Sequence, residues 1–153
     1  MRVRLPNGPE LDAYPGGIEE KLVSFLASNW QSLSPDSLKN TWFDFDDLNF
    51  TTSSAQITPE SQRQVNNIAA ILKAHPNAKI KIGGYTDKTG NEEANKKLSG
   101  ERAEAVRTAL VAAGVGSQVE GAEGYGSGFA KYPADAPEAD RVKDRHVSVS
   151  VRK

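Results

Sequence analysis

The sequence predicts an α+β fold, a mixed sheet with helices packed on one face, preceded by a β-hairpin and a helix. Residues 78–84 alternate lysine with isoleucine, which is typical of a strand with one wet and one buried face. Residues 58–76 and 91–114 place apolar side chains at helical spacing on either side of that strand. Helices and strands therefore alternate along most of the chain.

Residues 1–40 are predicted to form an N-terminal extension that packs on a main domain of residues 41–153. Val3 and Leu5 precede the turn sequence Pro6-Asn7-Gly8-Pro9, which predicts a hairpin within residues 2–14. A helix of about three turns follows, because apolar residues recur at the spacing of one helical face: Ile18, Leu22, Phe25, Leu26 and Trp30. Residues 32–39 are polar and contain a proline, so they indicate a linker or a short helical turn.

The main domain begins with residues 42–46, where aromatic and acidic side chains alternate. This pattern predicts a strand with Phe43 and Phe45 on one face and acidic residues on the other. Thr58-Pro59 is a favourable helix start, with a hydroxyl N-cap and proline at the first helical position. The helix should end before Pro76, because the residue preceding proline avoids helical dihedrals.

After the strand at residues 78–84, a long helix is expected from Asn91 to Ala113, with Gly114 at its left-handed C-terminal cap. A strand is expected over residues 118–123, and then a glycine- and proline-rich loop over residues 124–139. Alternating valines predict a final strand near the C-terminus. The main domain therefore contains strands and helices in the order β, α, β, α, β, β.

Composition excludes several classes of function. The 153 residues carry 19 Lys and Arg against 20 Asp and Glu, so the chain lacks the positive excess of a nucleic-acid-binding protein. No apolar stretch approaches the ~20 residues of a spanning helix, so we expect no direct membrane insertion by this chain. With no cysteine and two histidines outside any metal-binding spacing, we expect neither a metal nor a cofactor. The absence of cysteine leaves the cellular compartment open.

A charged constellation links the strand at residues 78–84 to the following helix. Helical spacing places five residues on one helix face: Asn95, Leu98, Arg102, Val106 and Leu110. Arg102 is thus a cation on an apolar stripe, which is costly unless a carboxylate or a ligand receives it. Asp87 follows the strand and faces the helix N-terminus, which favours a carboxylate. Either Asp87 and Arg102 form an internal ion pair, or a zwitterionic ligand inserts between them.

Linked motifs make the second interpretation specific. The turn GYTDKTGN at residues 84–91 precedes Asn95, Leu98-Ser99, Arg102-Ala103 and Val106, and later come Gly124-Tyr125-Gly126 and Arg145-His146-Val147. This pattern resembles the outer-membrane protein A-like (OmpA-like) peptidoglycan-binding domain, including the separation 102 − 87 = 15. The resemblance spans residues 41–152. It implies a sheet and helices of the βαβαββ type.

The resemblance also implies a function and a site. Family members bind the diaminopimelate residue of the cell-wall stem peptide without catalysis, and they tether an outer-membrane protein or lipoprotein to the wall. Asp87 would hold the ammonium of diaminopimelate and Arg102 its carboxylate, while Asn95 would order the site. The remaining site residues implied are Phe43 and Asp44, through backbone contacts, with Thr86, Leu98 and Arg145. A periplasmic location follows, with an anchor outside this chain, and a homodimer is compatible with the sequence.

Three positions depart from the family pattern. Tyr85 stands where histidine is usual, Asp144 where asparagine is common, and His146 where an arginine is common. These differences bear on pocket charge and ligand preference.

Two other interpretations compete with peptidoglycan binding. An envelope assembly module would keep Asp87 and Arg102 as an internal ion pair. A wall hydrolase would use Asp44 and Asp46, which share a strand face, but the sequence offers no second convergent acid, so we expect no enzyme. The aromatic residues at positions 42, 43 and 45 are predicted to be core rather than a sugar-stacking platform.

Overall fold

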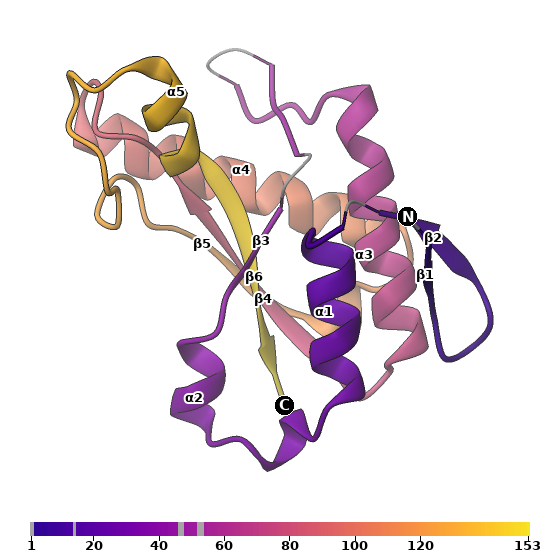
Figure 1. Ribbon diagram of the computed structural model, residues 1–153. Helices are drawn as coiled ribbons and strands as arrows, with labels where there is room; N and C mark the ends of the chain where they lie inside the picture. The colour runs from indigo at the N-terminus through magenta and orange to yellow at the C-terminus, as the bar shows by residue number, and fades with distance from the viewer. Residues whose placement is uncertain (1, 14, 46–47, 52–53) are drawn as a thin grey trace.

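The computed structural model describes residues 2–13, 15–45, 48–51 and 54–153. Within them, a four-stranded mixed sheet has the order β3-β6-β4-β5 (Figure 1). The strands are β3 (Phe43–Asp44), β4 (Lys79–Tyr85), β5 (Val119–Gly124) and β6 (His146–Arg152). β6 runs antiparallel to both neighbours, whereas β4 and β5 are parallel and joined through a helix. The predicted α+β class and βαβαββ order are confirmed.

Three long helices, α1 (Ile18–Ala27), α3 (Gln62–Ala74) and α4 (Glu92–Ala112), bury their apolar faces in the core formed with the sheet. A hairpin of β1 (Arg2–Arg4) and β2 (Glu10–Asp12) precedes α1. The short helices α2 (Pro35–Lys39) and α5 (Glu138–Arg141) lie outside this layer (Figure 1). Among the described residues, no helix has both the length and the apolar composition needed to cross a membrane.

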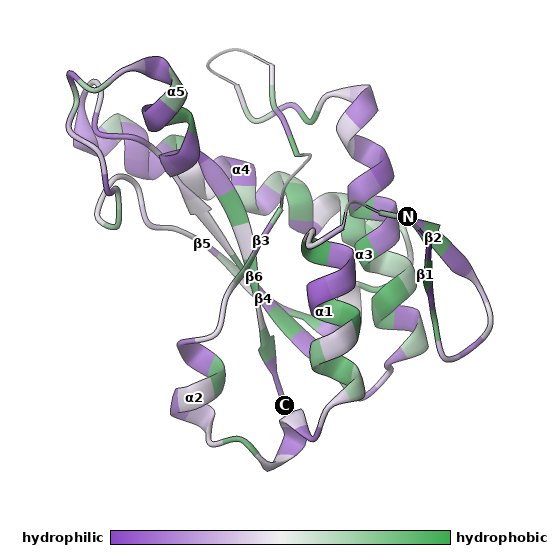
Figure 2. Cartoon of the chain, viewed as in Figure 1, coloured by the Kyte–Doolittle hydropathy of each residue, from purple (hydrophilic) through white to green (hydrophobic). Residues whose placement is uncertain are grey.

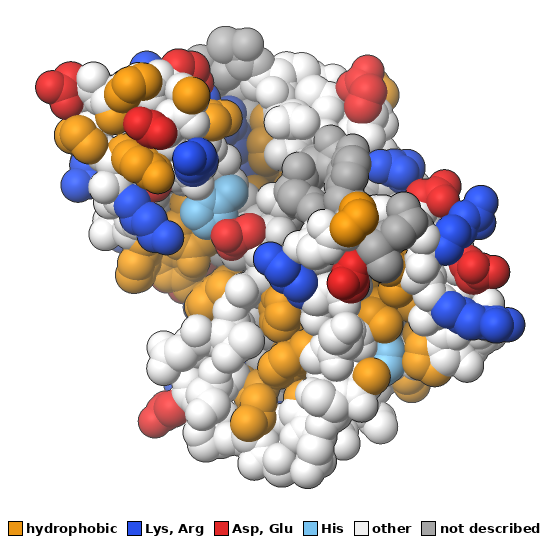
Figure 3. Space-filling model, viewed as in Figure 1, with side chains coloured by type: hydrophobic (Ala, Val, Ile, Leu, Met, Phe, Trp, Pro, Cys, Tyr) orange, Lys and Arg blue, Asp and Glu red, His pale blue; other side chains and the backbone are white. Residues whose placement is uncertain are grey.

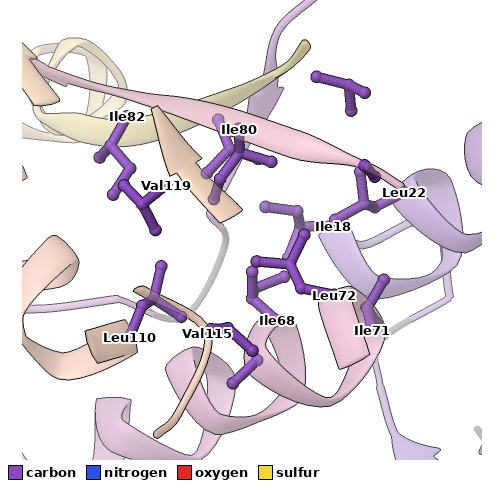
Figure 4. Close-up of a cluster of buried hydrophobic side chains, with 14 of the residues drawn as sticks. Ile18, Leu22, Ile68, Ile71, Leu72, Ile80, Ile82, Leu110, Val115 and Val119 are labelled. Carbon is purple, nitrogen blue, oxygen red and sulfur yellow. The ribbon is translucent and has the colours of Figure 1, made fainter. Parts of the chain in front are cut away.

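The hydrophobic core lies between the sheet and the long helices. Ile80 and Ile82 are fully buried and point from β4 toward side chains of α1, α3 and α4 (Figure 4). Leu5 and Leu11 of the hairpin belong to the same cluster. Hydrophobic residues accordingly follow the inner faces of the helices and the strands (Figure 2). Each fully buried aliphatic side chain of this kind stabilises the fold by about 1.5–3 kcal/mol.

The ends of α4 follow the prediction closely. Asn91 is the N-cap, and its side-chain oxygen accepts a hydrogen bond from the backbone N–H of Ala94 at 3.1 Å. Gly114 has φ 93°, a left-handed conformation that glycine adopts without the steric cost of a Cβ.

The start of α3 differs from the prediction. Thr58 does not cap the helix with its side chain, because a single 3₁₀ turn, Pro59–Ser61, comes first. The Thr58 hydroxyl instead shares a hydrogen bond of 2.7 Å with the Ser61 hydroxyl, and the α-helix begins at Gln62.

The strand expected over residues 42–46 is also shorter than predicted. Phe43–Asp44 pair with β6, the Phe45 N–H adds one hydrogen bond of 2.9 Å to the Val147 carbonyl, and Asp46 lies outside the described residues. Phe45 is buried in the core and Phe43 packs against it, but Trp42 does not join the core. Its ring instead contacts Tyr85 and Tyr125 on the opposite face of the sheet, because side chains alternate across a strand.

Two adjacent glycines at the end of β4 allow close packing on both faces. A Cβ added at Gly84 would lie 2.1 Å from the backbone carbonyl oxygen of Ser99 in α4. A Cβ at Gly83 would lie 2.9 Å from the ring of Tyr125 and 3.1 Å from the ring of Trp42. The missing side chains therefore bring α4 onto one face and aromatic rings onto the other.

Candidate functional site

A pocket of about 590 Å³ opens where β4 ends, between α4, residues 48–50 and the start of β6. Six residues predicted for the site are among those that line it: Thr86, Asp87, Asn95, Leu98, Arg102 and Arg145. The end of β4 and α4 form two walls of the pocket, and they meet closely because Gly84 has no side chain to keep them apart. In the space-filling view, charged side chains of both signs gather around α5 beside hydrophobic ones (Figure 3).

Asp87 is the buried anion of the pocket, with a relative exposure of 3%. Its Oδ1 accepts hydrogen bonds from the Thr89 backbone N–H, at 2.9 Å, and from the Thr89 hydroxyl. Its Oδ2 accepts from Arg145 Nη1 at 2.6 Å, and Arg141 Nη1 lies 3.6 Å away. Burial alone would raise the pKa of Asp87, but the bonds from Thr89 and Arg145 outweigh it and lower the pKa below its ordinary value. Asp87 is therefore ionised at neutral pH.

Arg145 joins the anion of the pocket to α5. Its guanidinium contacts Asp87 on one side and the carboxylate of Glu138 on the other. Arg141 also pairs with Glu138, at 3.1 Å. The hydrogen bond from Arg145 lowers the pKa of Glu138. The pKa of Arg145 is raised, chiefly by its hydrogen bond to Glu138 and less by that to Asp87, although burial alone would lower it. Asp87, Glu138 and Arg145 thus stay charged at neutral pH.

Arg102 is the cation on the α4 wall of the same pocket. Its Nε donates a hydrogen bond of 2.9 Å to the backbone carbonyl of Ser54, and its guanidinium lies 4.9 Å from the centre of the Phe50 ring. Burial lowers the pKa of Arg102, and the nearby Arg145 charge lowers it further, but an arginine remains protonated at neutral pH.

The ion pair between Asp87 and Arg102, one of the two arrangements that the sequence left open, is not formed. Asp87 pairs with Arg145 and Arg141, and no contact within 4 Å joins it to Arg102. The partners differ because β6 and α5 converge on the turn after β4, which helical spacing within α4 could not reveal. Arg145 was predicted for the site on the resemblance, whereas Glu138, Arg141 and Phe50 were missed, because no local pattern distinguishes them from surface residues.

Three predicted residues surround these charges. The Asn95 side-chain amide donates to the carbonyl of Thr89 at 2.8 Å and to that of Asp87 at 3.4 Å, so it holds the turn in place. Leu98 provides an apolar part of the wall. The Thr86 hydroxyl is buried and has no hydrogen-bond partner in the described part of the chain.

Phe43 and Asp44 lie away from the pocket, contrary to expectation. Phe43 faces the core, where its ring packs edge to face against Phe25 at 5.2 Å. Asp44 lies on the opposite face of the sheet and accepts a hydrogen bond from the Ser148 hydroxyl. Residues 48–50 occupy the place expected for the earlier strand, because β3 ends after Asp44.

The three departures from the family pattern have distinct positions. Tyr85 and His146 are cross-strand partners whose rings stack at 4.5 Å, and both line the pocket edge. Asp144 is buried and accepts hydrogen bonds from the backbone N–H groups of Lys131 and Tyr132 at 2.9 and 3.0 Å. Asp144 therefore holds the loop before α5, while Tyr85 and His146 change the wall itself.

The arrangement suits recognition of a small molecule that carries both charges. A carboxylate and a guanidinium occupy separate walls of one pocket and are held by different protein partners. Charge-assisted hydrogen bonds to such groups are stronger than neutral ones, and the planar guanidinium matches a carboxylate.

Comparison with known proteins relates this chain to one family. The model of the OmpA family matches residues 49–145. Outer membrane protein P5 of Haemophilus influenzae is 31% identical over 117 residues, which cover 76% of this chain and 32% of that protein. Peptidoglycan-binding protein ArfA of Mycobacterium tuberculosis is 37% identical over 102 residues, covering 67% of this chain and 31% of that protein. This chain therefore spans about a third of the length of these relatives.

A solved structure shares the fold. The peptidoglycan-associated lipoprotein of Burkholderia pseudomallei superposes with a TM-score of 0.56 at 32% identity, covering 74% of this chain and 92% of that one.

Proposed function

Because the chain belongs to the OmpA family, we propose that it binds cell-wall peptidoglycan without catalysis, through the diaminopimelate residue of the stem peptide. The names of two relatives support the partner: ArfA is called peptidoglycan-binding, and the Burkholderia lipoprotein is called peptidoglycan-associated. The observation that carries the proposal is that Asp87 and Arg102 line one pocket without pairing with each other.

The chemistry of the ligand fits this separation. Within a stem peptide, diaminopimelate keeps a free side-chain end that bears one ammonium and one carboxylate. The ammonium would bind Asp87, and the carboxylate would bind Arg102 through its guanidinium fork. Since the ammonium must share Asp87 with Arg145, and all the charges lose water, we expect weak binding at a single site. Many sites on a polymeric wall would strengthen attachment.

The pKa directions in the pocket favour binding over hydrolysis. Glycoside hydrolysis requires a carboxylic acid whose pKa is raised so that it can donate a proton. Asp87 and Glu138 instead have lowered pKa values, because Thr89 and then Arg145 donate hydrogen bonds to Asp87, and Arg145 donates to Glu138. These carboxylates are thus suited to hold a cation rather than to supply a proton.

We further propose a periplasmic location, with attachment to the outer membrane through a segment outside this chain. Relatives named as an outer membrane protein and as a lipoprotein support this placement. In the alternative, an assembly module, the internal partners of Asp87 are Arg141 of α5 and Arg145, which precedes β6, rather than Arg102.

Calorimetric titration with two matched stem peptides tests the proposal. One peptide contains diaminopimelate, and the other contains lysine, which keeps the ammonium and lacks the second carboxylate. We expect the diaminopimelate peptide to bind about tenfold more tightly, since a hydrogen-bonded charge pair contributes ~1.5 kcal/mol or more.

Arg102→Lys should remove most of that difference, because lysine keeps the charge but loses the fork. Arg107→Lys is the matched control, as Arg107 lies on the exposed part of α4 and pairs with Glu104. Equal affinity of the unaltered chain for both peptides, or no binding by a folded sample, would contradict the proposal.

A further inference from the structure

A second hollow lies on the face of the sheet opposite the core. It has a volume of about 460 Å³ and combines four large aromatic side chains with polar ones. The aromatic side chains are Trp42, Tyr85, Tyr125 and Phe129, and the polar neighbours include Asp44, Lys131 and Ser148. We call this hollow, with those seven residues and with His146, the aromatic groove.

The aromatic rings of the groove form an ordered surface. Tyr85 lies between His146, at 4.5 Å with an interplanar angle of 16°, and Tyr125, at 5.3 Å and 26°. The three residues form a stacked row across neighbouring strands. Trp42 meets the rings of Tyr85 and Tyr125 edge on, at 6.4 and 6.1 Å. Gly83 leaves the space beneath Tyr125 and Trp42 that a side chain would occupy.

The groove keeps apolar surface in contact with solvent. Phe129 is 68% exposed although its ring touches those of Tyr85 and Tyr125 at 5.9 and 5.7 Å. An exposed phenylalanine that extends an ordered aromatic surface, beside polar groups, is typical of a ligand-binding site.

Polar groups line the same groove. The Asp44 carboxylate accepts from the Ser148 hydroxyl and lies 3.5 Å from His146 Nε2. The Asp44 side chain is 65% exposed, so its oxygens remain open to a ligand hydroxyl or amide N–H. Burial, with smaller contributions from Tyr125, Asp44 and Glu123, raises the pKa of Tyr85, so its hydroxyl stays protonated.

These features match the chemistry of a pyranose ring. The C–H bonds on one side of such a ring are attracted to the negative face of an aromatic ring, and its hydroxyl and amide groups need hydrogen-bond partners. The size also fits, because 460 Å³ lies within the range of small-ligand pockets. A stable interface with a protein partner would, by comparison, bury about 800 Å² of surface on each partner.

The groove adjoins the pocket at Asp87. Tyr85 and His146 line both hollows, one at each side of the strand end. A stem peptide is attached to an amino sugar of the glycan, and three extended residues span roughly 10 Å. One muropeptide could thus place its diaminopimelate in the pocket and its sugar in the groove.

We propose that the aromatic groove binds an amino-sugar residue of the glycan strand. The proposal rests on the proposed function, since it takes the sugar from the same polymer as the peptide. The sugar stacks on Phe129 and Trp42, and Asp44 and Lys131 contact its polar groups.

The test is calorimetric titration of the full chain with three probes: a diaminopimelate stem peptide, the same peptide carrying its disaccharide, and the free disaccharide. We expect the disaccharide-peptide to bind about three- to tenfold more tightly than the peptide, as one or two aromatic contacts would provide. Phe129→Ala should remove this gain and leave the affinity for the peptide unchanged.

Two further variants secure the interpretation. Val111→Ala is the matched control, because Val111 is a comparably exposed apolar residue, at 54%, on α4. Trp42→Ala, checked for folding by its thermal transition, should lose the same gain as Phe129→Ala.

The possible outcomes bear on the two proposals in different ways. The sugar site is overturned, and the proposed function left intact, if the peptide and the disaccharide-peptide bind with equal affinity. The same holds if Phe129→Ala weakens the affinity for both probes equally. Absence of binding by all three probes overturns both proposals. Binding of the disaccharide-bearing probes alone, abolished by Phe129→Ala, supports the groove and overturns the role of diaminopimelate.

Discussion

The pocket at Asp87 and the aromatic groove share one strand end but are held together by different forces. In the pocket, charged side chains from α4, α5 and the start of β6 meet, and each charge is fixed by hydrogen bonds. In the groove, neighbouring strands place aromatic rings side by side through the register of the sheet. Both regions join segments far apart in the chain, but the pocket depends on hydrogen-bonded charges from helices and loops, whereas the aromatic surface follows from strand pairing.

Adjacent glycines make both regions possible. Gly84 faces the backbone of α4, which has no freedom to move aside, while Gly83 faces the ends of two rings, which can rotate. The pocket should therefore tolerate a change at its glycine less than the groove does.

The largest expected effect is loss of binding in Asp87→Asn. Removing this anion should weaken the affinity for a diaminopimelate peptide about 30-fold or more, because it deletes the partner of the ammonium and leaves Arg145 without its buried carboxylate. Calorimetry measures the affinity, and circular dichroism verifies the fold. Asp135→Asn, an exposed position in the loop before α5, is the control. Unchanged affinity in a folded Asp87→Asn sample would exclude Asp87 from the site.

Gly84→Ala should lower the free energy of unfolding by about 2–3 kcal/mol, because the new methyl group meets a backbone carbonyl and separates β4 from α4. It should also weaken peptide binding, since Asp87 and Arg102 would move apart. Urea unfolding measures the change. Gly121→Ala on β5 is the control, as nothing lies within 4 Å of its added Cβ. Similar losses in the two variants would show that close packing at Gly84 is not what matters.

Gly83→Ala should cost about 1 kcal/mol, because the rings of Tyr125 and Trp42 can yield where a backbone cannot. We expect the near-ultraviolet circular dichroism of the aromatic groove to change while peptide affinity stays within about twofold of the unaltered chain, as small repacking of side chains predicts. A loss of stability as large as that of Gly84→Ala would remove the distinction between the two regions.

The smallest effect concerns pH. The pKa of Asp87 is lowered on folding, so its ionised form stabilises the folded state at every pH above the ordinary value of 3.8. That contribution declines below 3.8 and is gone once the pH has fallen past the lower pKa of the folded state. Urea unfolding as a function of pH should therefore show a shallower acid decline in Asp87→Asn. Parallel curves for the two proteins would contradict the lowered pKa.

Much of the fold was predictable from local patterns. The alternation in β4, the caps of α4 and the spacing of Leu98, Arg102 and Val106 each reflect interactions within a few residues. The family motif also placed Asp87 and Arg102 in one site. Local pattern failed at Thr58, where a 3₁₀ turn competes with a helix cap. The expectation that Trp42 belongs to the core failed because its ring lies on the face of the sheet opposite the core, against Tyr85 and Tyr125.

The sequence by itself determined the α+β class, the order of the elements and the presence of an anion and a cation near the end of β4, since periodicity and turn chemistry are local properties. Tertiary structure alone decided that Asp87 pairs with Arg145 and Arg141, that Ser54 and Phe50 hold Arg102, and that Phe43 and Asp44 lie outside the pocket. These contacts join residues separated by up to 58 positions, and only the packing of β6, α5 and α4 around one strand end brings them together.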